Sequence, residues 1–164
     1  YLLIFPISIK IDKSMEAVEV ALDNKEYCEP VNVIITGRYH WRMLGSDTFD
    51  GNIKFDRYPL TMDKELVQSK NLPTLKFDKG SAPLEYGQWM NFTIFGWVHT
   101  KAFFNKLIVQ VFEYHESPDG GRGGSWNTID GKCIVAPATN REEALVILQK
   151  ITNKYLSPYE YWIE

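Results

Sequence analysis

The sequence is poor in the residues that most often carry chemistry. Its 164 residues include only two cysteines and three histidines. There is no CxxC pair, and the histidines stand far from both cysteines, so the ligand spacing of a zinc site is missing. Neither the GxSxG pattern of a serine hydrolase nor the GxxxxGK[ST] order of a phosphate-binding loop occurs. The sequence therefore predicts no metal, no cofactor and no catalytic residue.

Clustered positive charge is also missing. The 18 Lys and Arg residues are scattered among 21 Asp and Glu residues, and the net charge is −3. Nucleic acids are bound through a gathered positive face, and anionic membranes through a polybasic patch. The charge distribution therefore argues against both kinds of partner.

The two cysteines, Cys28 and Cys133, are far apart along the chain. In an oxidising compartment they would be able to pair and close a long loop. Two separate buried thiols are the favoured interpretation, because nothing in the spacing indicates a disulfide framework.

Residues suited to a β-rich core are abundant. Hydrophobic residues make up 45% of the chain and aromatic residues 14%, and aromatic side chains favour strands. Short alternating runs recur between turn signals, with no alternation of strands and helices that would predict a parallel sheet. We predict a mainly β domain, an antiparallel β-sandwich or partly open barrel of about seven to nine strands, with one C-terminal α-helix.

The stretch Asn91–Glu113 is the predicted centre of that sheet. It holds two β-prone runs, Phe92–His99 and Lys106–Phe112, which we expect to form an antiparallel hairpin buried on both sides. In that arrangement His99 lies at the turn and His115 at the open end, so the two imidazoles do not share a metal ion.

Several further segments have specific signals. Gly37 predicts a bulge or bend, and Asp50-Gly51 is a strong turn dipeptide. Ser14–Asn24 is expected to form a strand of its own that ends in a turn. For the C-terminal helix, residues 140–156, Thr139 is the predicted N-cap and Glu142 completes a capping box.

The first 13 residues have two compatible interpretations. The apolar run at the amino end is typical of the last part of a signal sequence or membrane anchor, and its alternation from Leu3 to Ile11 is typical of a first strand. We therefore expect residues 14–164 to form a single domain, and we expect an extracytoplasmic protein that is secreted or tethered to a membrane at its amino end.

A glycine-rich segment is the predicted binding loop. Ser117–Ser125 has four glycines in nine residues, which we expect to hold no strand and to form an exposed loop. Loops often carry function on a rigid scaffold, so Arg122 and Trp126 are the predicted ligand contacts. Trp89 joins them because it also flanks a loop and offers an aromatic surface.

The segments IKFDRYPLT, LKFDKG, FGWVHT and APATNREEAL together resemble small bacterial extracytoplasmic proteins with an N-terminal anchor. That resemblance implies no activity. The favoured function is a non-enzymatic module that binds an unidentified protein or small ligand. Two alternatives stay open: a hydrolase with a site of dispersed Asp, Glu and His residues, and a small intracellular immunity or inhibitor protein.

Overall fold

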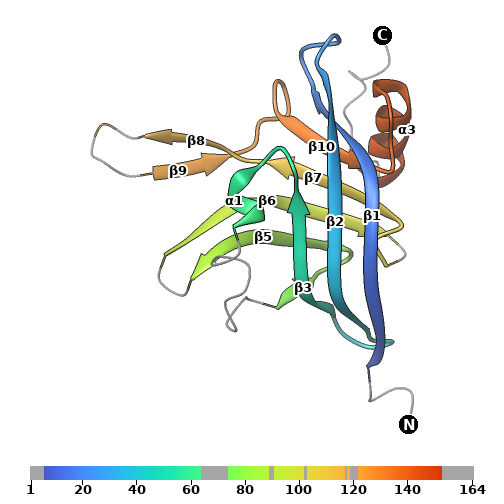
Figure 1. Cartoon of the computed structure of the whole chain (residues 1–164). Helices are drawn as coiled ribbons and strands as arrows, with labels where there is room; N and C mark the ends of the chain where they lie inside the picture. The colour runs from blue at the N-terminus through green and yellow to red at the C-terminus, as the bar shows by residue number, and fades with distance from the viewer. Residues whose placement is uncertain are drawn as a thin grey trace.

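The computed structural model describes residues 6–63, 74–88, 91–101, 103–116, 118 and 122–152. Eight strands form one antiparallel sheet in the order β4-β3-β2-β1-β10-β7-β6-β5, and β8 and β9 form a second, two-stranded sheet. The large sheet curls into a nearly closed, partly open barrel (Figure 1). This confirms the predicted fold class, including the C-terminal helix.

The elements follow one another along the chain as a meander. Their bounds are β1 Ile7–Ala21, β2 Cys28–Trp41, β3 Asp47–Phe55, α1 Pro59–Met62, β4 Leu75–Phe77, β5 Ser81–Gln88, β6 Asn91–Lys101, β7 Lys106–Val111, β8 Glu113–Glu116, β9 Arg122–Ser125, β10 Lys132–Ala136 and α3 Arg141–Thr152. The two edge strands of the large sheet, β4 and β5, meet only at their connecting turn through a bridge between Asp78 and Ser81.

Two apolar cores lie on opposite faces of this sheet. The inner core is rich in aromatic rings, with Phe49, Phe55, Phe77 and Phe104 fully buried inside the barrel. The outer core lies beneath α3, which packs against β1 and β10 (Figure 1). Because side chains alternate between faces, a strand covered on both sides has consecutive buried residues, as the run Ala17–Ala21 does.

The predicted hairpin of the two runs in Asn91–Glu113 is confirmed, but its central position is wrong. β6 and β7 pair antiparallel from Gly96–Val111 to Lys101–Lys106. The middle of the sheet is instead β1 and β10, and β6 lies next to the edge strand β5. Phe92 at the start of β6 is 56% exposed, so this stretch is not buried along its whole length.

Three local predictions need correction. β1 is one continuous strand of 15 residues, so there is no break before Ser14. Gly37 pairs in unbroken register with Gly51, without a bulge, and Asp50-Gly51 lies inside β3 rather than in a turn. The glycine pair serves packing: a Cβ on Gly51 would lie 2.6 Å from the Gly37 Cα and 2.7 Å from the ring of Phe49.

The cap of α3 lies one residue later than predicted. The helix begins at Arg141, and the Glu143 amide donates to Asn140 Oδ1 at 2.9 Å, which makes Asn140 the N-cap. The Glu143 carboxylate in turn accepts from the Thr139 amide at 2.8 Å. The hydrogen bonds that this carboxylate accepts from the Thr139 amide and hydroxyl lower the pKa of Glu143. The helix extends to Thr152, and the rest of the predicted range lies outside the described residues.

The cysteines are separate free thiols, as favoured, but only Cys133 is buried and Cys28 is half-buried. Cys28 on β2 and Cys133 on β10 lie opposite the same residue of the strand between them, Val20. Two strand spacings place their Cα atoms about 9–10 Å apart. A disulfide needs Cα atoms within roughly 7 Å, so the sheet itself prevents the bond.

The close approach of Gly37 and Gly51 predicts that an added side chain destabilises the fold. Gly51→Ala should lower the free energy of unfolding by about 1–3 kcal/mol, because the added methyl meets backbone and a packed ring. Gly123→Ala is the matched control, since a Cβ there meets nothing within 4 Å. Urea unfolding of both variants measures the difference, and equal stabilities would contradict the packing role of the pair.

Candidate functional site

The candidate site lies where β6 and β7 separate, which we call the split. β6 and β7 pair as far as Gly96 and Val111, and one more hydrogen bond joins the Phe112 amide to the Phe95 carbonyl at 2.9 Å. After Phe112 the chain turns away from the edge of β6 and continues as β8. On its other edge β6 stays paired with β5 as far as Asn91. Within the described part of the chain, residues 91–94 of β6 thus have a strand partner on one edge only.

The departing chain forms a projecting hairpin, here called the arm, which comprises β8 and β9 (Figure 1). The expectation that Ser117–Ser125 holds no strand is wrong for Arg122–Ser125, which forms β9. The glycines suit this strand, because Gly124 lies opposite Tyr114 and beneath its ring. A Cβ on Gly124 would lie 2.9 Å from Tyr114 Cε1, so the bare backbone makes room for the phenol.

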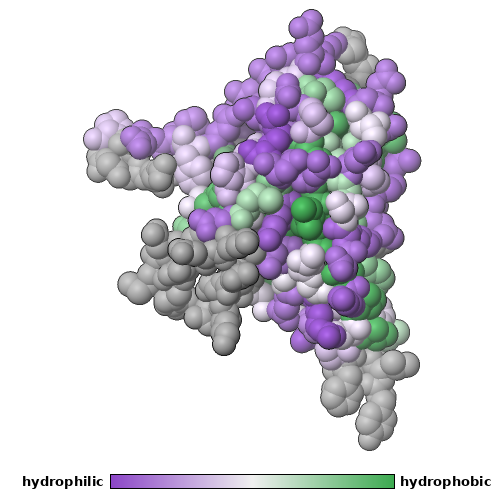
Figure 2. Space-filling view, in the orientation of Figure 1, coloured by the Kyte–Doolittle hydropathy of each residue, from purple (hydrophilic) through white to green (hydrophobic). Residues whose placement is uncertain are grey.

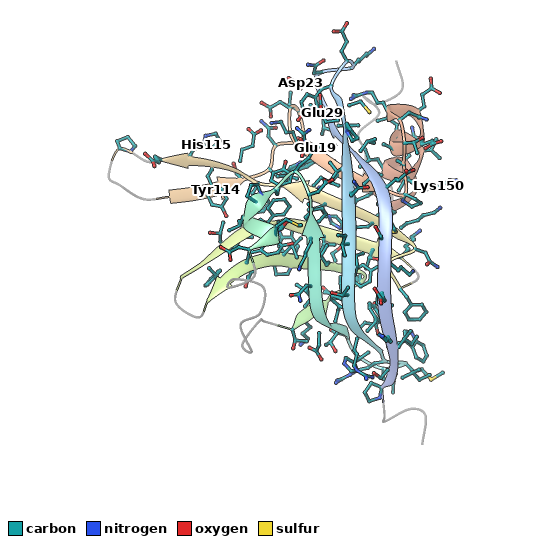
Figure 3. All side chains as sticks on the ribbon, in the orientation of Figure 1. Glu19, Asp23, Glu29, Tyr114, His115 and Lys150 are labelled. Atoms are coloured by element: carbon teal, nitrogen blue, oxygen red, sulfur yellow. The ribbon has the colours of Figure 1, made fainter. Side chains whose placement is uncertain are left out.

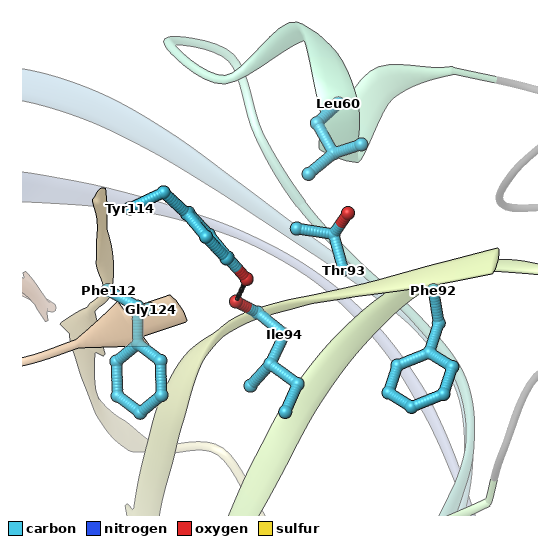
Figure 4. Close-up of a pocket in the computed structure, with 7 residues that line it drawn as sticks. All are labelled: Leu60, Phe92, Thr93, Ile94, Phe112, Tyr114 and Gly124. Atoms are coloured by element: carbon cyan, nitrogen blue, oxygen red, sulfur yellow. Dashed lines mark hydrogen bonds between the residues drawn. The ribbon is translucent and has the colours of Figure 1, made fainter. Parts of the chain in front are cut away.

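A cleft of about 540 Å³ opens between the arm, the start of β6 and α1 (Figure 4). Its lining residues are Leu60, Phe92, Thr93, Ile94, Phe112, Tyr114 and Gly124. The Tyr114 side chain spans the split, and its hydroxyl donates to the Ile94 carbonyl (Figure 4). Phe92, Ile94 and Phe112 extend to one side of the strand, and Leu60 and Thr93 lie on the other.

The lining of the cleft is suited to binding. The lining residues that the structure describes contribute apolar and aromatic surface together with two hydroxyl groups, and none of them carries a carboxylate, imidazole, amine or thiol. Phe92 is 56% exposed and Tyr114 is 40% exposed, although large aromatic side chains are usually buried. Exposed aromatic surface around a concave site is typical of ligand and partner binding.

The sequence-predicted contacts lie near the cleft but do not line it. Trp126 follows β9, is partly buried against the outer core, and donates its indole N–H to the Lys132 carbonyl at 3.0 Å. Arg122 begins β9 opposite Glu116, and the structure describes its backbone only. Trp89 lies outside the described residues. Sequence reasoning missed Phe92, Ile94 and Tyr114, because strand runs with this composition are usually core.

A buried carboxyl group lies at the end of the barrel that α1 covers. Glu19 (Figure 3) is 2% exposed. Its carboxylate accepts hydrogen bonds from the hydroxyls of Tyr27, at 2.5 Å, and Tyr58. Arg57 lies close enough to act electrostatically on this group and forms an ion pair with Glu29 at 3.1 Å. Burial and the hydrogen bond to Glu19 raise the pKa of Tyr27 to about 12, and the same causes raise the pKa of Tyr58.

One serine contacts a histidine on the outer face of the barrel. Ser81 and His99 pair across β5 and β6, with Ser81 Oγ 2.7 Å from His99 Nδ1. His99 Nε2 lies 3.0 Å from Gln110 Oε1. Burial lowers the pKa of His99, which favours a neutral ring that accepts from Ser81 and donates to Gln110. The neutral side-chain amide of Gln110 thus takes the place that a carboxylate usually has in a Ser–His–Asp catalytic triad.

Metal-binding clusters and membrane-spanning helices are both absent from the described residues. No group of three or more His, Cys, Asp and Glu side chains is arranged to hold a metal ion in that part of the chain. None of the helices described there is both long enough and apolar enough to cross a membrane.

Comparisons with protein-family models, with curated proteins and with solved structures found no match to this chain.

The hydrogen bonds to Glu19 predict a loss of stability in alkali. The pKa of Tyr27 rises from 10 to about 12 on folding, so its contribution is complete below pH 10 and is lost as the pH rises through 12. Tyr27→Phe should lower the free energy of unfolding by about 1 kcal/mol at pH 8. It should also make the decline between pH 10 and 12 shallower.

Urea unfolding of both proteins across that range measures the effect. Cys133, whose pKa is also raised by burial, titrates in both proteins and cancels in the difference. Parallel declines in the two proteins would contradict the role given to Tyr27.

Proposed function

We propose that this chain is a non-enzymatic binding domain that takes its ligand in the cleft beneath the arm. The observation that carries the proposal is the split between β6 and β8, which leaves exposed aromatic surface around a cavity of about 540 Å³. Ligand sites are typically concave, mostly apolar and supplied with few polar groups, and this cleft has that composition.

The chemistry of the lining favours binding over hydrolysis. Catalysis of hydrolysis needs a nucleophile or an acid–base pair that faces the substrate, and the described lining residues offer only the hydroxyls of Thr93 and Tyr114. The contact between Ser81 and His99 belongs to a different face of the sheet. Arg122 and Trp126 stay proposed contacts, because Arg122 begins β9 and Trp126 directly follows it, each two positions from the cleft residue Gly124.

An apolar dye tests the cleft. We expect 1-anilinonaphthalene-8-sulfonate to bind the folded chain with a fluorescence increase, and Phe92→Ser to weaken that binding roughly 5- to 30-fold through lost apolar contact. Val146→Ser is the matched control, because Val146 is 49% exposed on the distant helix α3. Titration by fluorescence gives both affinities. Equal weakening by the two variants, or no binding at all, would remove the cleft as a site.

We also propose that the amino end of the chain holds the domain at a membrane surface in an extracytoplasmic compartment. The amino end of β1 and the turn between β2 and β3 lie at the same end of the molecule (Figure 1). Apolar residues are exposed there: Ile7 is 42%, Met43 59% and Leu44 69% exposed. Most residues on the face shown in Figure 2 are hydrophilic, and hydrophobic residues, coloured green, are visible over β2, β3 and this end of β1.

Vesicle binding tests the tether. The full chain should cosediment with phosphatidylcholine vesicles, and Met43→Asp with Leu44→Asp should reduce the bound fraction at least about tenfold. Ile129→Asp is the control, because Ile129 is 74% exposed at the opposite end of the sheet. If the control loses as much of its vesicle-bound fraction, or if the original chain does not sediment with vesicles, this end of the molecule does not face the membrane.

A further inference from the structure

The open edge of β6 presents backbone hydrogen-bonding groups to the cleft. The Ile94 carbonyl points into the split, because it accepts from the Tyr114 hydroxyl. Backbone groups of a strand alternate between its two edges, so the amide and carbonyl of Phe92 face the same way. The amide and carbonyl of Thr93 face β5, where Thr93 pairs with Tyr86. The cleft therefore contains the start of an unused β-ladder.

We propose that the ligand of this cleft is an extended peptide segment that adds to β6 as an extra strand, between β6 and β8. This proposal rests on the binding function assigned to the cleft above. An unpaired strand edge is a template for another chain, and extended peptides use such edges for recognition. In the free protein the Tyr114 hydroxyl occupies the position on the Ile94 carbonyl that a peptide N–H would take.

The side chains around the edge indicate an alternating sequence in the partner. Successive residues of an added strand would face opposite sides of the sheet. One set would meet the row of Phe92, Ile94 and Phe112, and the other set would meet Leu60 and Thr93 (Figure 4). The row of three apolar side chains favours apolar residues at every second position of the peptide.

Charge around the cleft indicates that the partner is basic as well. Glu85 is the register partner of Ile94, and no cation in the described part of the chain lies within salt-bridge distance of it. β8 adds the exposed residues Glu113 and Glu116, but Glu113 lies 3.6 Å from Lys132 and Glu116 is the register partner of Arg122, so the preference for a basic partner rests on Glu85. A Lys or Arg side chain on the added strand would reach Glu85 across one intervening strand. The partner class is therefore an extended segment with alternating apolar residues and a basic side chain.

Selection from a phage-displayed library of random peptides, each about 12 residues long, on the immobilised full chain is the first step of the test. Enriched peptides should share alternating apolar positions and at least one Lys or Arg. The best peptide is then synthesised with an N-methyl group at each position in turn. We expect methylation to weaken binding about tenfold or more at alternate positions and little at the positions between, because only alternate amides face β6.

Variants of the chain locate the complex and its charge preference. Glu85→Gln should weaken binding of the selected peptide about threefold and flatten the dependence of affinity on salt. Glu142→Gln on α3 is the matched control and should leave both unchanged. Tyr114→Phe should strengthen peptide binding, because it keeps the ring that lines the cleft and removes the hydroxyl that occupies the Ile94 carbonyl.

The possible outcomes separate this proposal from the binding function on which it rests. If the dye binds in a Phe92-dependent manner but no peptide is enriched, strand addition is wrong and the cleft remains a site. Strand addition is also wrong if methylation shows no alternation or if Tyr114→Phe weakens peptide binding. If the dye and the peptide are both insensitive to Phe92→Ser, the cleft and the strand addition are both wrong.

Discussion

The backbone of β6 imposes the constraint from which the proposed site follows. Amide and carbonyl groups inside a sheet need partners, and most strands of this chain find them on both edges. β6 has β5 along one edge for nearly its whole length, but β7 along the other edge only as far as Gly96. The chain turns away at Phe112, and the tyrosine two residues later reaches back to the Ile94 carbonyl. The cleft, its exposed aromatic rings and its open ladder all follow from that departure.

The rest of the fold holds this feature in place. β1 and β10, in the middle of the sheet, are buried on one face by the aromatic interior and on the other by α3. β7 continues this two-sided burial, with Leu107 and Val109 in the inner core and Ile108 in the outer one. The arm thus continues directly from a strand that is buried on both faces. The hydrogen bonds from Tyr27 and Tyr58 to Glu19 stabilise the end of the barrel next to α1, whose Leu60 lines the cleft.

The sequence was sufficient for the class of fold but not for the place of its strands. Alternation of apolar residues identified the hairpin of β6 and β7, and the charged, periodic run after Thr139 identified the helix. Asp50-Gly51 was misassigned because the same dipeptide serves turns and close strand packing, and only the presence of Gly37 across the ladder distinguishes them. The glycines of β9 misled in the same way, since their role under the Tyr114 ring depends on a residue ten positions earlier.

The candidate site was harder to predict for a related reason. Phe92 and Ile94 have the composition of core residues, and their exposure depends on where β7 ends rather than on their own neighbours. The buried position of Glu19 was equally hard to predict from the sequence, because its hydrogen-bond partners Tyr27 and Tyr58 come from different parts of the chain. The segment expected to bind, Ser117–Ser125, leads into β9, which supplies the cleft residue Gly124. Only the strand register revealed the open edge of β6.

Amide hydrogen exchange of the free chain, resolved by residue with NMR, tests the open edge of β6 most directly. Phe92 and Thr93 are neighbours in the same strand, but their amides face opposite edges. We expect the Thr93 amide, which faces β5, to be protected and the Phe92 amide, which faces the cleft, to exchange far faster. Equal protection of the two amides would mean that this edge of β6 is already paired, and would contradict the proposed site.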